Sequence, residues 1–411
     1  MKKLRSLSLA MVSALALTPA LTTPAQAAAS TEFTLDAQVI DGGQQVVSVT
    51  LETTRYRINP RSLGVNTFRV HATGRNPYAS LSPSQVMGTY DRDRTITSVS
   101  LDRDGDIVIK MVRGEDAPAA FTFGWSQEQS RNIMLDLNYS ITQRLPIKLR
   151  NGRQLKLSQI KQGKLVDKEV DAFSHGATDD GLKYRLFTPH QARPKNPRPL
   201  IVWLHGGGEG GWAKAYNNDL PLIANRGALA LSTAKAQKVF KGAYVAAPQA
   251  DTRWLDNPTM GYAPRVKAMI DELAEQYDVD RRRIYVAGPS NGGYMTMRMV
   301  ADYPKLFAAN VTICPARVYQ DKVMVSDADI RKMRKTPTWI VQATNDQTLP
   351  YKPNGLYTHQ VLGNSTLTSY PDVAWNGHTF PGHFSWVYVA RNDPANAKGQ
   401  HIWQWMAQQH R

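Results

Sequence analysis

The sequence predicts two domains, a small all-β sandwich followed by a larger α/β domain with a doubly wound, mostly parallel sheet. Three observations support this prediction. From Glu32 to about Leu155, apolar and polar residues alternate with the period of two that half-buried strands require. Beyond Lys168, short apolar runs alternate with helical patterns over about 240 residues. Residues 156–168 are polar and basic, so we place the two domains at residues 28–160 and 165–411.

The first 27 residues are a predicted secretory signal peptide. Basic residues at the start precede an apolar run from Leu7 to Leu17, and Ala25-Gln26-Ala27 fits the small-residue pattern of a cleavage site. The apolar run is shorter than the ~20 residues that span a bilayer. We therefore expect residues 1–27 to be removed and the other 384 residues (411 minus 27) to be exported, to the periplasm or outside the cell.

Composition narrows the range of partners. The chain has 50 basic and 34 acidic residues, a net charge of +16, and the signal peptide accounts for three of the basic residues. This excess fits an anionic envelope surface as a partner, but it fits a solvated basic surface without a dedicated partner better. No RNA-binding or zinc signature accompanies the charge, so nucleic acid is not an expected partner.

The single cysteine, Cys314, lies in an apolar run, where we expect a buried, inert thiol and no intrachain disulfide.

The first domain reads as a series of short strands. They are expected at residues 33–40, 47–51, 67–72, 95–101, 107–112, 121–123 and 133–137. Between two of these strands, Asp102 to Asp106 alternates aspartates as a calcium loop would. The glycine is misplaced for such a loop and the closing glutamate is missing, so we expect an Asp-Gly hairpin turn and no metal.

The second domain reads as buried parallel strands separated by helices. The strands are expected at residues 184–188, 200–204, 243–247, 283–287, 308–314, 338–343 and 367–370. The clearest helix spans Pro264 to Tyr277, because Val266, Ile270 and Leu273 recur on one face at helical spacing. In a sheet of this kind, functional side chains gather at the carboxyl ends of the strands.

One strand end carries a candidate nucleophile. The apolar run from Arg283 to Ala287 leads into Gly288-Pro289-Ser290-Asn291-Gly292, a GxSxG pattern followed by a predicted helix from Gly292 to Tyr303. Such a turn holds serine in a strained backbone conformation and needs small neighbours, which leaves the hydroxyl exposed above the sheet. The pattern alone is weak, since an ordinary turn has the same letters.

Other strand ends supply what a nucleophilic serine needs. After the strand at 200–204 comes His205-Gly206-Gly207-Gly208-Glu209, whose backbone amides near Gly207 and Gly208, together with that of Asn291, would form an oxyanion hole. After the strand at 338–343 comes Asp346, placed to orient an imidazole, with Asp372 as the alternative. For the general base, His378 and His383 are both candidates, and spacing does not separate them.

Together these segments resemble those of a known family of enzymes. The runs from Leu204 to Gly211 and from Gly288 to Tyr294, the Asn345-Asp346 turn, and His383-Phe384-Ser385-Trp386 resemble exported α/β-hydrolase esterases that have an N-terminal immunoglobulin-like domain. The second domain is also similar to predicted peptidases related to prolyl oligopeptidase and to polyhydroxybutyrate depolymerase-like esterases. The resemblance covers most of the mature chain, strongly in the second domain and loosely in the first.

The resemblance implies roles for individual residues. In those esterases a tryptophan follows the catalytic histidine by three residues, a pattern that falls on His383 and Trp386 and not on His378. Carried over, Ser290 is the nucleophile, His383 the general base and Asp346 the residue that orients it. Two tryptophans, Trp386 and Trp254, are candidates for the substrate pocket, although Trp254 fits core packing equally well.

The sequence therefore predicts acyl transfer through an acyl-enzyme, on a small-molecule or polymeric ester, with no metal or cofactor. Two alternatives stay open at this point. One is a serine peptidase of the prolyl oligopeptidase type, which would use the same machinery on another leaving group. The other is a non-catalytic protein that binds the envelope. For the first domain, which shows no aromatic ladder or acidic cluster, we expect a structural or substrate-gating role.

Overall fold

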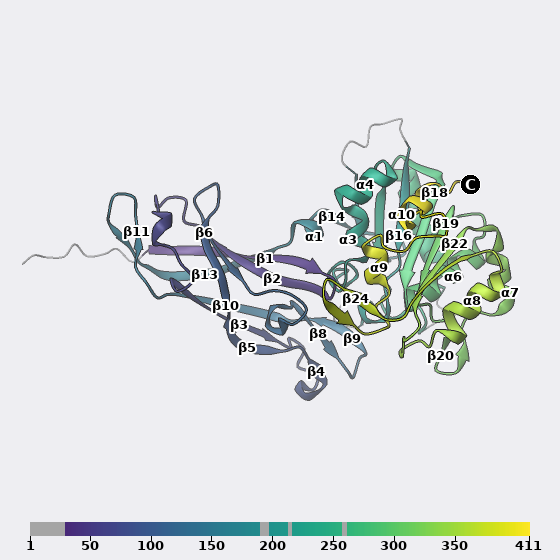
Figure 1. The fold of residues 1–411 in the computed structure, drawn as a ribbon, viewed down its shortest axis with the longest axis horizontal. Coiled ribbons are helices and arrows are strands. Elements are labelled where there is room, and N and C mark those ends of the chain that lie inside the picture. The colour runs from purple at the N-terminus through teal and green to yellow at the C-terminus, as the bar shows by residue number, and fades with distance from the viewer. Residues whose placement is uncertain (1–28, 190–196, 213–215, 257–260) are drawn as a thin grey trace, which may run out of the picture.

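The computed structural model describes residues 29–189, 197–212, 216–256 and 261–411. The predicted signal peptide at residues 1–27 lies outside these ranges, so that prediction stays a prediction. Within them an all-β domain extends from one end of an α/β domain (Figure 1). The predicted fold class is confirmed.

Alternating side chains build the all-β domain around one main core and one smaller cluster. Its strands are β1 Ala29–Ile40, β2 Gly43–Leu51, β3 Phe68–Arg75, β4 Val86–Met87, β5 Tyr90–Arg94, β6 Ile96–Leu101, β7 Ile107–Met111, β8 Phe123–Ser126, β9 Arg131–Met134, β10 Asp136–Gln143, β11 Ile147–Lys148, β12 Gln154–Leu155 and β13 Leu157–Val166. The main sheets run in the orders β13-β1-β2-β7-β6, β10-β3-β5 and β4-β8-β9. Phe33, Val49 and Ile109 are among the residues buried in the core that the first two of these sheets share, whereas Val86 of β4 and Ile133 of β9 belong to a separate small cluster.

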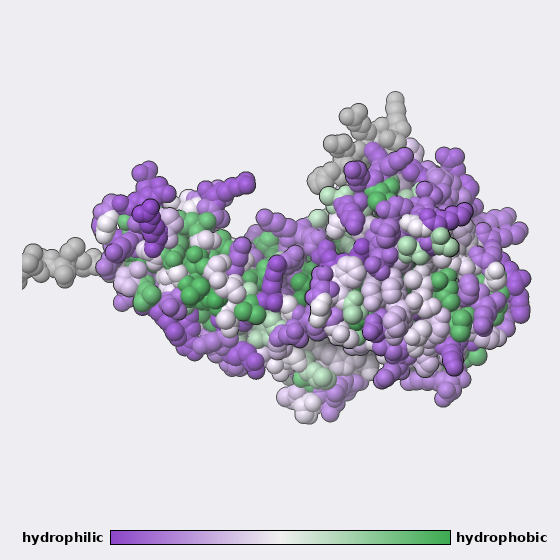
Figure 2. Space-filling view, viewed as in Figure 1, coloured by the Kyte–Doolittle hydropathy of each residue, from purple (hydrophilic) through white to green (hydrophobic). Residues whose placement is uncertain are grey.

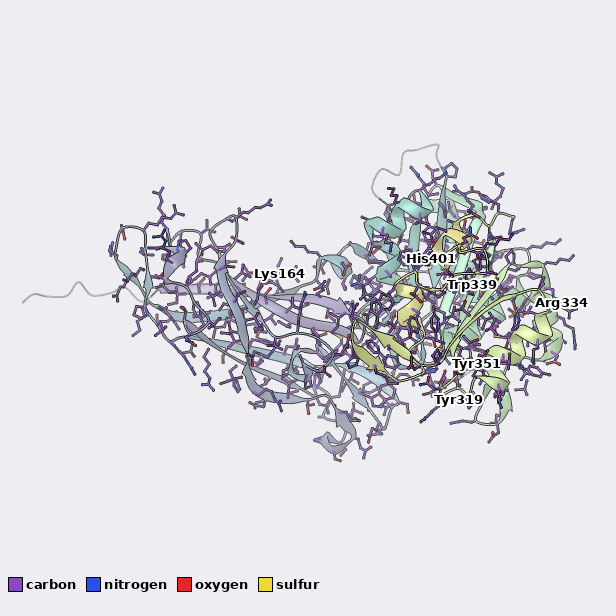
Figure 3. All side chains as sticks on the ribbon, viewed as in Figure 1. Lys164, Tyr319, Arg334, Trp339, Tyr351 and His401 are labelled. Carbon is purple, nitrogen blue, oxygen red and sulfur yellow. The ribbon has the colours of Figure 1, made fainter. Side chains whose placement is uncertain are left out.

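Most of the polar and basic segment at residues 156–168 is a strand, β13. β13 pairs in parallel with β1 and continues to Val166, beyond the predicted domain end at residue 160. It is an edge strand whose side chains are mostly exposed, including Lys164 (Figure 3). Because water covers so much of it, the strand carries no apolar alternation, which is the signal that sequence reasoning depends on.

The aspartate-rich turn between β6 and β7 is a hairpin. Asp102 accepts hydrogen bonds through Oδ1 from the amides of Asp104, Gly105 and Asp106. Gly105 has φ +93°, a conformation that suits glycine. The carboxylate of Asp106 turns away, to the amides of Thr53 and Thr54. Two of the aspartates thus serve the turn and its neighbouring strand.

The α/β domain is built on an eight-stranded sheet. Its strands, in spatial order, are β14 Phe173–Ala177, β15 Lys183–Phe187, β17 Tyr244–Pro248, β16 Arg198–Trp203, β18 Val279–Pro289, β19 Ala309–Ile313, β22 Thr338–Ala343 and β23 Thr366–Tyr370. From β17 to β23 the pairs are parallel. β15 was expected to be parallel as well, but it pairs antiparallel with both β14 and β17.

Helices cover both faces of this sheet, because alternate residues of its strands point into two separate cores. One core includes Val202 and Val286 and receives α5 Tyr262–Gln276, α6 Asn291–Asp302, α7 Asp327–Lys332 and α8 Tyr357–Leu362. The other includes Trp203 and Tyr285 and receives α1 Lys168–Asp171, α2 Leu220–Ile223, α3 Gly227–Ser232, α4 Ala234–Phe240, α9 Trp386–Ala390 and α10 Ile402–Ala407. The carboxyl ends of the parallel strands therefore stay open.

The two domains are joined by buried and charged contacts. Val39 of β1 lies in the second core of the α/β domain, and its carbonyl accepts a 2.6 Å hydrogen bond from Arg226. Arg391 makes a two-pronged ion pair with Asp41, at 2.9 and 2.7 Å. These contacts fix the all-β domain beside the strand ends where the predicted site lies.

The outside of the molecule is mostly hydrophilic on the face drawn in Figure 2, with smaller apolar areas on both domains. Among the described residues, none of the helices has the length and apolar character needed to cross a bilayer.

Candidate active site

Ser290 lies in a sharp turn between β18 and α6. Its φ of 57° and ψ of −115° are a strained combination for a residue with a side chain. The turn is held by the Ser290 amide, which donates to the Ile313 carbonyl at 2.8 Å. A Cβ on Gly292 would lie 1.9 Å from the Leu204 carbonyl oxygen, and one on Gly288 would lie 2.4 Å from it. Only glycine fits at both positions, which explains the spacing of the GxSxG pattern.

The glycine-rich loop after β16 lies across from this turn. Gly207 and Gly208 open a short 3₁₀ turn, Gly207–Glu209, and both line the same cleft as Ser290 and Asn291. Asn291 is the first residue of α6, where backbone amides of a helix point outward without partners inside the helix. The structure thus brings together the three residues whose amides were predicted to form an oxyanion hole.

His383 and Asp346 form a hydrogen-bonded pair. His383 Nδ1 lies 2.9 Å from Asp346 Oδ2, and because a carboxylate accepts, the imidazole donates from Nδ1. Asp346 is 4% exposed and lies behind His383, which lines the cleft. This leaves Nε2 of His383 as the nitrogen available to a reacting group.

Local contacts fix the two loops that carry this pair. A Cβ on Gly382 would lie 2.2 Å from Asn345 Oδ1, so the His383 loop approaches the Asp346 turn as closely as backbone allows. The buried hydroxyl of Ser385 accepts a 2.9 Å hydrogen bond from the Ala343 amide at the end of β22. Trp386 packs edge-on against the His383 ring.

The alternative candidates for the general base and the orienting carboxylate, His378 and Asp372, lie outside the cleft. His378 is on the short strand β25 His378–Phe380, packs against Phe380, and has Nδ1 3.8 Å from Asp116. Asp372 follows β23, and its carbonyl accepts from the Tyr388 hydroxyl. Neither is among the described residues that line the Ser290 cleft.

Of the two candidate pocket tryptophans, Trp386 lines the cleft and Trp254 does not. Trp254 is 1% exposed and packs between His205 and Tyr262, with ring centroids 4.7 and 5.3 Å away. Its indole nitrogen donates to the His205 carbonyl at 3.0 Å, and its amide donates to Asn291 Oδ1 at 2.8 Å. Trp254 thus supports the residue after Ser290 from the core.

His205 also has a supporting position. It is fully buried, with Nδ1 2.6 Å from the Gly206 carbonyl and Nε2 accepting from the Ala250 amide at 3.0 Å. Burial lowers the pKa of this imidazole to about 3, so it is neutral and occupied with the backbone on both sides.

Glu209, to which the sequence assigned no role, is a buried residue that supports the glycine-rich loop. It is buried, and its Oε1 accepts a 2.7 Å hydrogen bond from Asn225. Its carboxyl group also faces the amide of Gly206. Burial is the main cause that raises its pKa to about 7.

The cleft above Ser290 has a volume of about 480 Å³ and is lined by both domains. From the α/β domain come Phe384 and Trp386, and from the all-β domain come Phe123, Trp125 and Asn132. Sequence reasoning missed this second group. Its only signal is period-two alternation in the Phe123 to Trp125 strand, which says which side chains share a face but not what that face meets.

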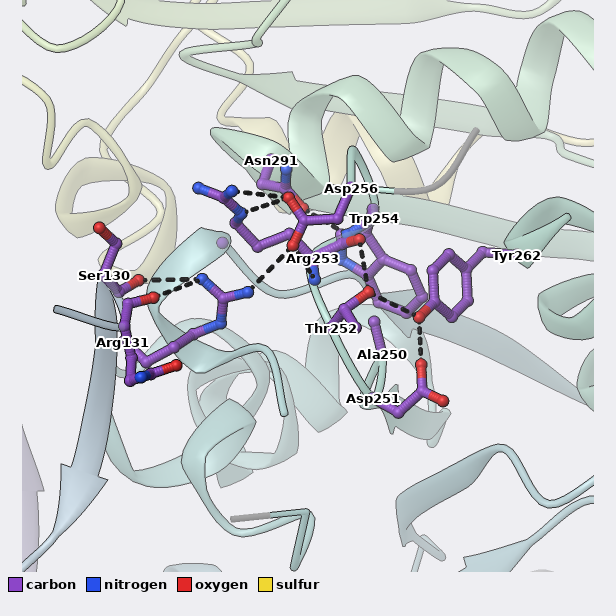
Figure 4. A network of polar contacts seen from close by, with 12 residues as sticks. Ser130, Arg131, Ala250, Asp251, Thr252, Arg253, Trp254, Asp256, Tyr262 and Asn291 are labelled. Atoms are coloured by element: carbon purple, nitrogen blue, oxygen red, sulfur yellow. Dashed lines mark hydrogen bonds and ion pairs between the residues drawn. The ribbon is translucent and has the colours of Figure 1, made fainter. Parts of the chain in front are cut away.

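A network of polar contacts ties the all-β domain to the loop after β17 (Figure 4). Arg131 at the start of β9 donates to Asp256 at 3.1 Å, and it also donates to the Ser130 carbonyl at 3.1 Å. Arg253 binds the same carboxylate at 2.7 Å. The next residue, Trp254, holds Asn291 through its amide. The two domains therefore meet within a few residues of the predicted oxyanion hole.

Cys314 lies beside the pair, and one ligand atom from each of Cys314, Asp346 and His383 falls within 4.8 Å of the others. Both oxygens of Asp346 already accept hydrogen bonds, from Gln342, Thr348, Leu349 and His383. Burial raises the pKa of the Cys314 thiol well above its usual value, which keeps the metal-binding thiolate form disfavoured. The donor set fits a hydrogen-bonded pair better than a metal site.

Two family models match the chain. Residues 33–156 match the esterase Ig-like N-terminal domain, and residues 261–332 match the prolyl oligopeptidase family. The second match includes Ser290 and its turn. The predicted kinship with α/β-hydrolases that have an immunoglobulin-like N-terminal domain is confirmed.

Individual relatives match short parts of the chain. Acetylxylan esterase A of Emericella nidulans is 38% identical over 69 residues, which are 16% of this chain and 23% of that protein. Poly(3-hydroxyalkanoate) depolymerase C of Paucimonas lemoignei is 40% identical over 53 residues, 13% of each chain. The chain thus spans less than a quarter of the length of these two relatives. The crystal structure of a thermostable esterase shares the fold, with a TM-score of 0.75 at 24% identity over 92% of this chain and 99% of that one.

Proposed function

We propose that this chain, which joins an esterase Ig-like N-terminal domain to an α/β-hydrolase domain of the prolyl oligopeptidase type, is an exported serine hydrolase of carboxylic esters. The observation that carries the proposal is the His383–Asp346 pair, with His383 lining the cleft in which Ser290 stands in a strained turn. A buried carboxylate behind an imidazole, and an imidazole beside a serine, is the arrangement that activates a hydroxyl as a nucleophile.

The reaction would proceed in two halves. Ser290 Oγ attacks the ester carbonyl carbon while His383 Nε2 takes its proton, and the imidazolium that forms is stabilised by Asp346. The negative oxygen of the tetrahedral intermediate accepts from the amides of Gly207, Gly208 and Asn291. Collapse breaks the bond to the alcohol, which receives the proton from His383. Water then attacks the acyl-enzyme by the same route and releases the acid.

The amides would account for a large part of the catalysis. Removing one oxyanion-hole donor typically costs about 3 kcal/mol of transition-state stabilisation. Here the donors belong to the backbone, so their positions depend on how the glycine-rich loop and α6 pack.

The test is the Ser290→Ala variant. We expect it to lose ester hydrolysis and labelling by a fluorophosphonate probe, while its thermal unfolding stays close to wild type because an alanine fits the turn. Hydrolysis or labelling that persists undiminished in this variant would exclude Ser290 as the nucleophile. A wild-type protein that reacts with no serine-directed probe would favour a non-catalytic envelope binder.

A serine peptidase is the second candidate, because residues 261–332 match the prolyl oligopeptidase family. A set of nitrophenyl esters measured beside peptide nitroanilides separates the two. We expect ester hydrolysis to depend on Ser290 and the nitroanilides to be poor substrates.

Export is supported by the sequence of residues 1–27. The test is to follow the chain with and without those residues in cell fractions.

A further inference from the structure

The all-β domain has a hairpin that reaches the candidate active site. β8 and β9 pair antiparallel, with Phe123 opposite Met134 and Trp125 opposite Asn132. Since side chains alternate along strands, these four share one face of the hairpin. Phe123 and Met134 pack against the second core of the α/β domain, while Trp125 and Asn132 line the cleft with Ser290. One face of the hairpin therefore meets both the core and the site.

Trp125 and Asn132 touch the glycine-rich loop itself. A Cβ on Gly208 would lie 3.1 Å from Cζ3 of Trp125 and 3.1 Å from Nδ2 of Asn132. Trp125 nevertheless stays 36% exposed, although it is a large apolar residue beside a packed interface. A tryptophan that is held on one side and left open on the other offers a flat apolar surface to whatever enters the cleft.

The α/β domain contributes aromatic rings to the same cleft. Phe384 and Trp386 stack on each other with ring centroids 4.4 Å apart, and both line the cleft. Aromatic rings from both domains line this cleft of about 480 Å³, and they suit a flat apolar group because rings gain from stacked and edge-to-face contacts beyond their burial of area.

Contacts to both domains hold the β8–β9 hairpin in place beside the cleft. Arg131, beside Asn132, is buried and held by Asp256 and by carbonyls of its own turn (Figure 4). Ile133 packs on the other side with Leu81 and Val86 of the all-β domain. The position of Trp125 is therefore set by both domains, as a specificity-determining side chain needs.

We propose that Trp125 of the all-β domain is part of the substrate site and binds an aromatic ring of the ester, in its acyl or its alcohol part. The proposal rests on the proposed function, and it gives the first domain a direct role in choosing substrates. The alternative is that Trp125 only supports the glycine-rich loop, in which case its loss affects every ester alike.

The test compares esters that differ by a ring. Methyl 3-phenylpropanoate is paired with methyl butanoate, and 2-phenylethyl acetate with ethyl acetate, and hydrolysis is followed by proton release. In Trp125→Leu, which keeps apolar bulk, we expect kcat/KM to fall about tenfold for the ring-bearing member of at least one pair and less than about twofold for its partner. Trp125→Phe, which keeps a ring, should retain most of the preference.

Two controls separate the outcomes. Leu145→Ala changes an exposed apolar residue near β11, at the far end of the same domain, and should leave all four rates unchanged (Figure 1). The rate of fluorophosphonate labelling in Trp125→Leu should match wild type if the glycine-rich loop is intact. Equal losses on all four esters, or no loss on any, would overturn the role of Trp125. Activity that persists in Ser290→Ala would instead overturn the proposed function.

Discussion

At the scale of single residues, the carboxylate of Asp346 is the most completely bonded group near the cleft. Its Oδ1 accepts from the amides of Thr348 and Leu349 at 3.0 and 2.9 Å, and its Oδ2 accepts from Gln342 Nε2 and His383 Nδ1 at 3.1 and 2.9 Å. A carboxylate accepts at both oxygens, and no neutral side chain of the same shape does so.

We predict that Asp346→Asn lowers kcat for ester hydrolysis by about a thousandfold or more, because the amide group would face donors and favour the wrong tautomer of His383. The measurement is kcat on a nitrophenyl ester, with fluorophosphonate titration to count competent sites. Asp372→Asn is the matched control and should retain wild-type kcat. The reverse result, with Asp372→Asn impaired and Asp346→Asn active, would move the orienting role to Asp372.

Glu209 makes stability depend on pH. Burial raises its pKa to about 7 from a usual 4.5, so between these values the folded chain holds a proton that the unfolded chain has lost. The free energy of unfolding should therefore fall as pH rises from 4.5 to 7 and level off above 7, by at most about 3 kcal/mol from this group.

Urea unfolding at pH 5 and pH 8 measures this effect. Glu209→Gln should reduce the difference between the two pH values, whereas Glu275→Gln, at an exposed site on α5, should keep the wild-type difference. If both variants keep it, the pH dependence comes from other groups.

Sequence reasoning reached the site residues unevenly. Ser290 and Asp346 follow buried strands, and strand ends are readable from apolar runs. His383 lies in a loop, and only the tryptophan three residues later separated it from His378. Strand alternation gave no sign of a role for Trp125, because that role comes from a contact with Gly208, which is distant in sequence and belongs to another domain.

At the scale of elements, the turn between β18 and α6 depends on close approach of backbone to backbone. The carbonyl of Leu204 at the end of β16 occupies the space that a side chain on Gly292 would need, at 1.9 Å from the missing Cβ. A backbone neighbour cannot rotate away as a side chain can, so the cost of a substitution here is high.

We predict that Gly292→Ala destabilises the protein by about 3 kcal/mol or more and removes activity, because either β16 or α6 has to move. The control is Gly64→Ala, where no heavy atom lies within 4 Å of the added Cβ and φ is not positive. Urea midpoints and nitrophenyl ester rates report the two effects. A Gly292→Ala variant with wild-type stability and rate would show that the two elements yield easily.

Elements with a strong apolar period or a continuous apolar run were predictable, and those with neither were not. The helix expected at residues 264–277 is α5 Tyr262–Gln276, and the strand expected at 338–343 is β22 with the same bounds. β13 and β14 were missed. Both are edge strands in which few side chains are buried, so their sequences resemble linkers although their backbones pair.

At the scale of the whole molecule, the two domains share parts of one core. Val39 belongs to the second core of the α/β domain, and Phe123 and Met134 pack against it. Arg226, itself buried, reaches the Val39 carbonyl and pairs with Glu169, and Arg391 pairs with Asp41. Separating the domains would expose these apolar side chains and break the Arg226–Val39 hydrogen bond and the Arg391–Asp41 ion pair, and both effects are costly.

We therefore predict that the chain unfolds as one cooperative unit. Scanning calorimetry should show a single transition whose calorimetric and van't Hoff enthalpies agree, and circular dichroism and tryptophan fluorescence should report the same urea midpoint. Arg391→Met, which removes the partner of Asp41 at the interface, should shift that one transition to lower temperature without splitting it. Leu145→Ala, away from the interface, is the control. Two resolved transitions in the wild type would show that the all-β domain unfolds independently of the α/β domain and would contradict this prediction.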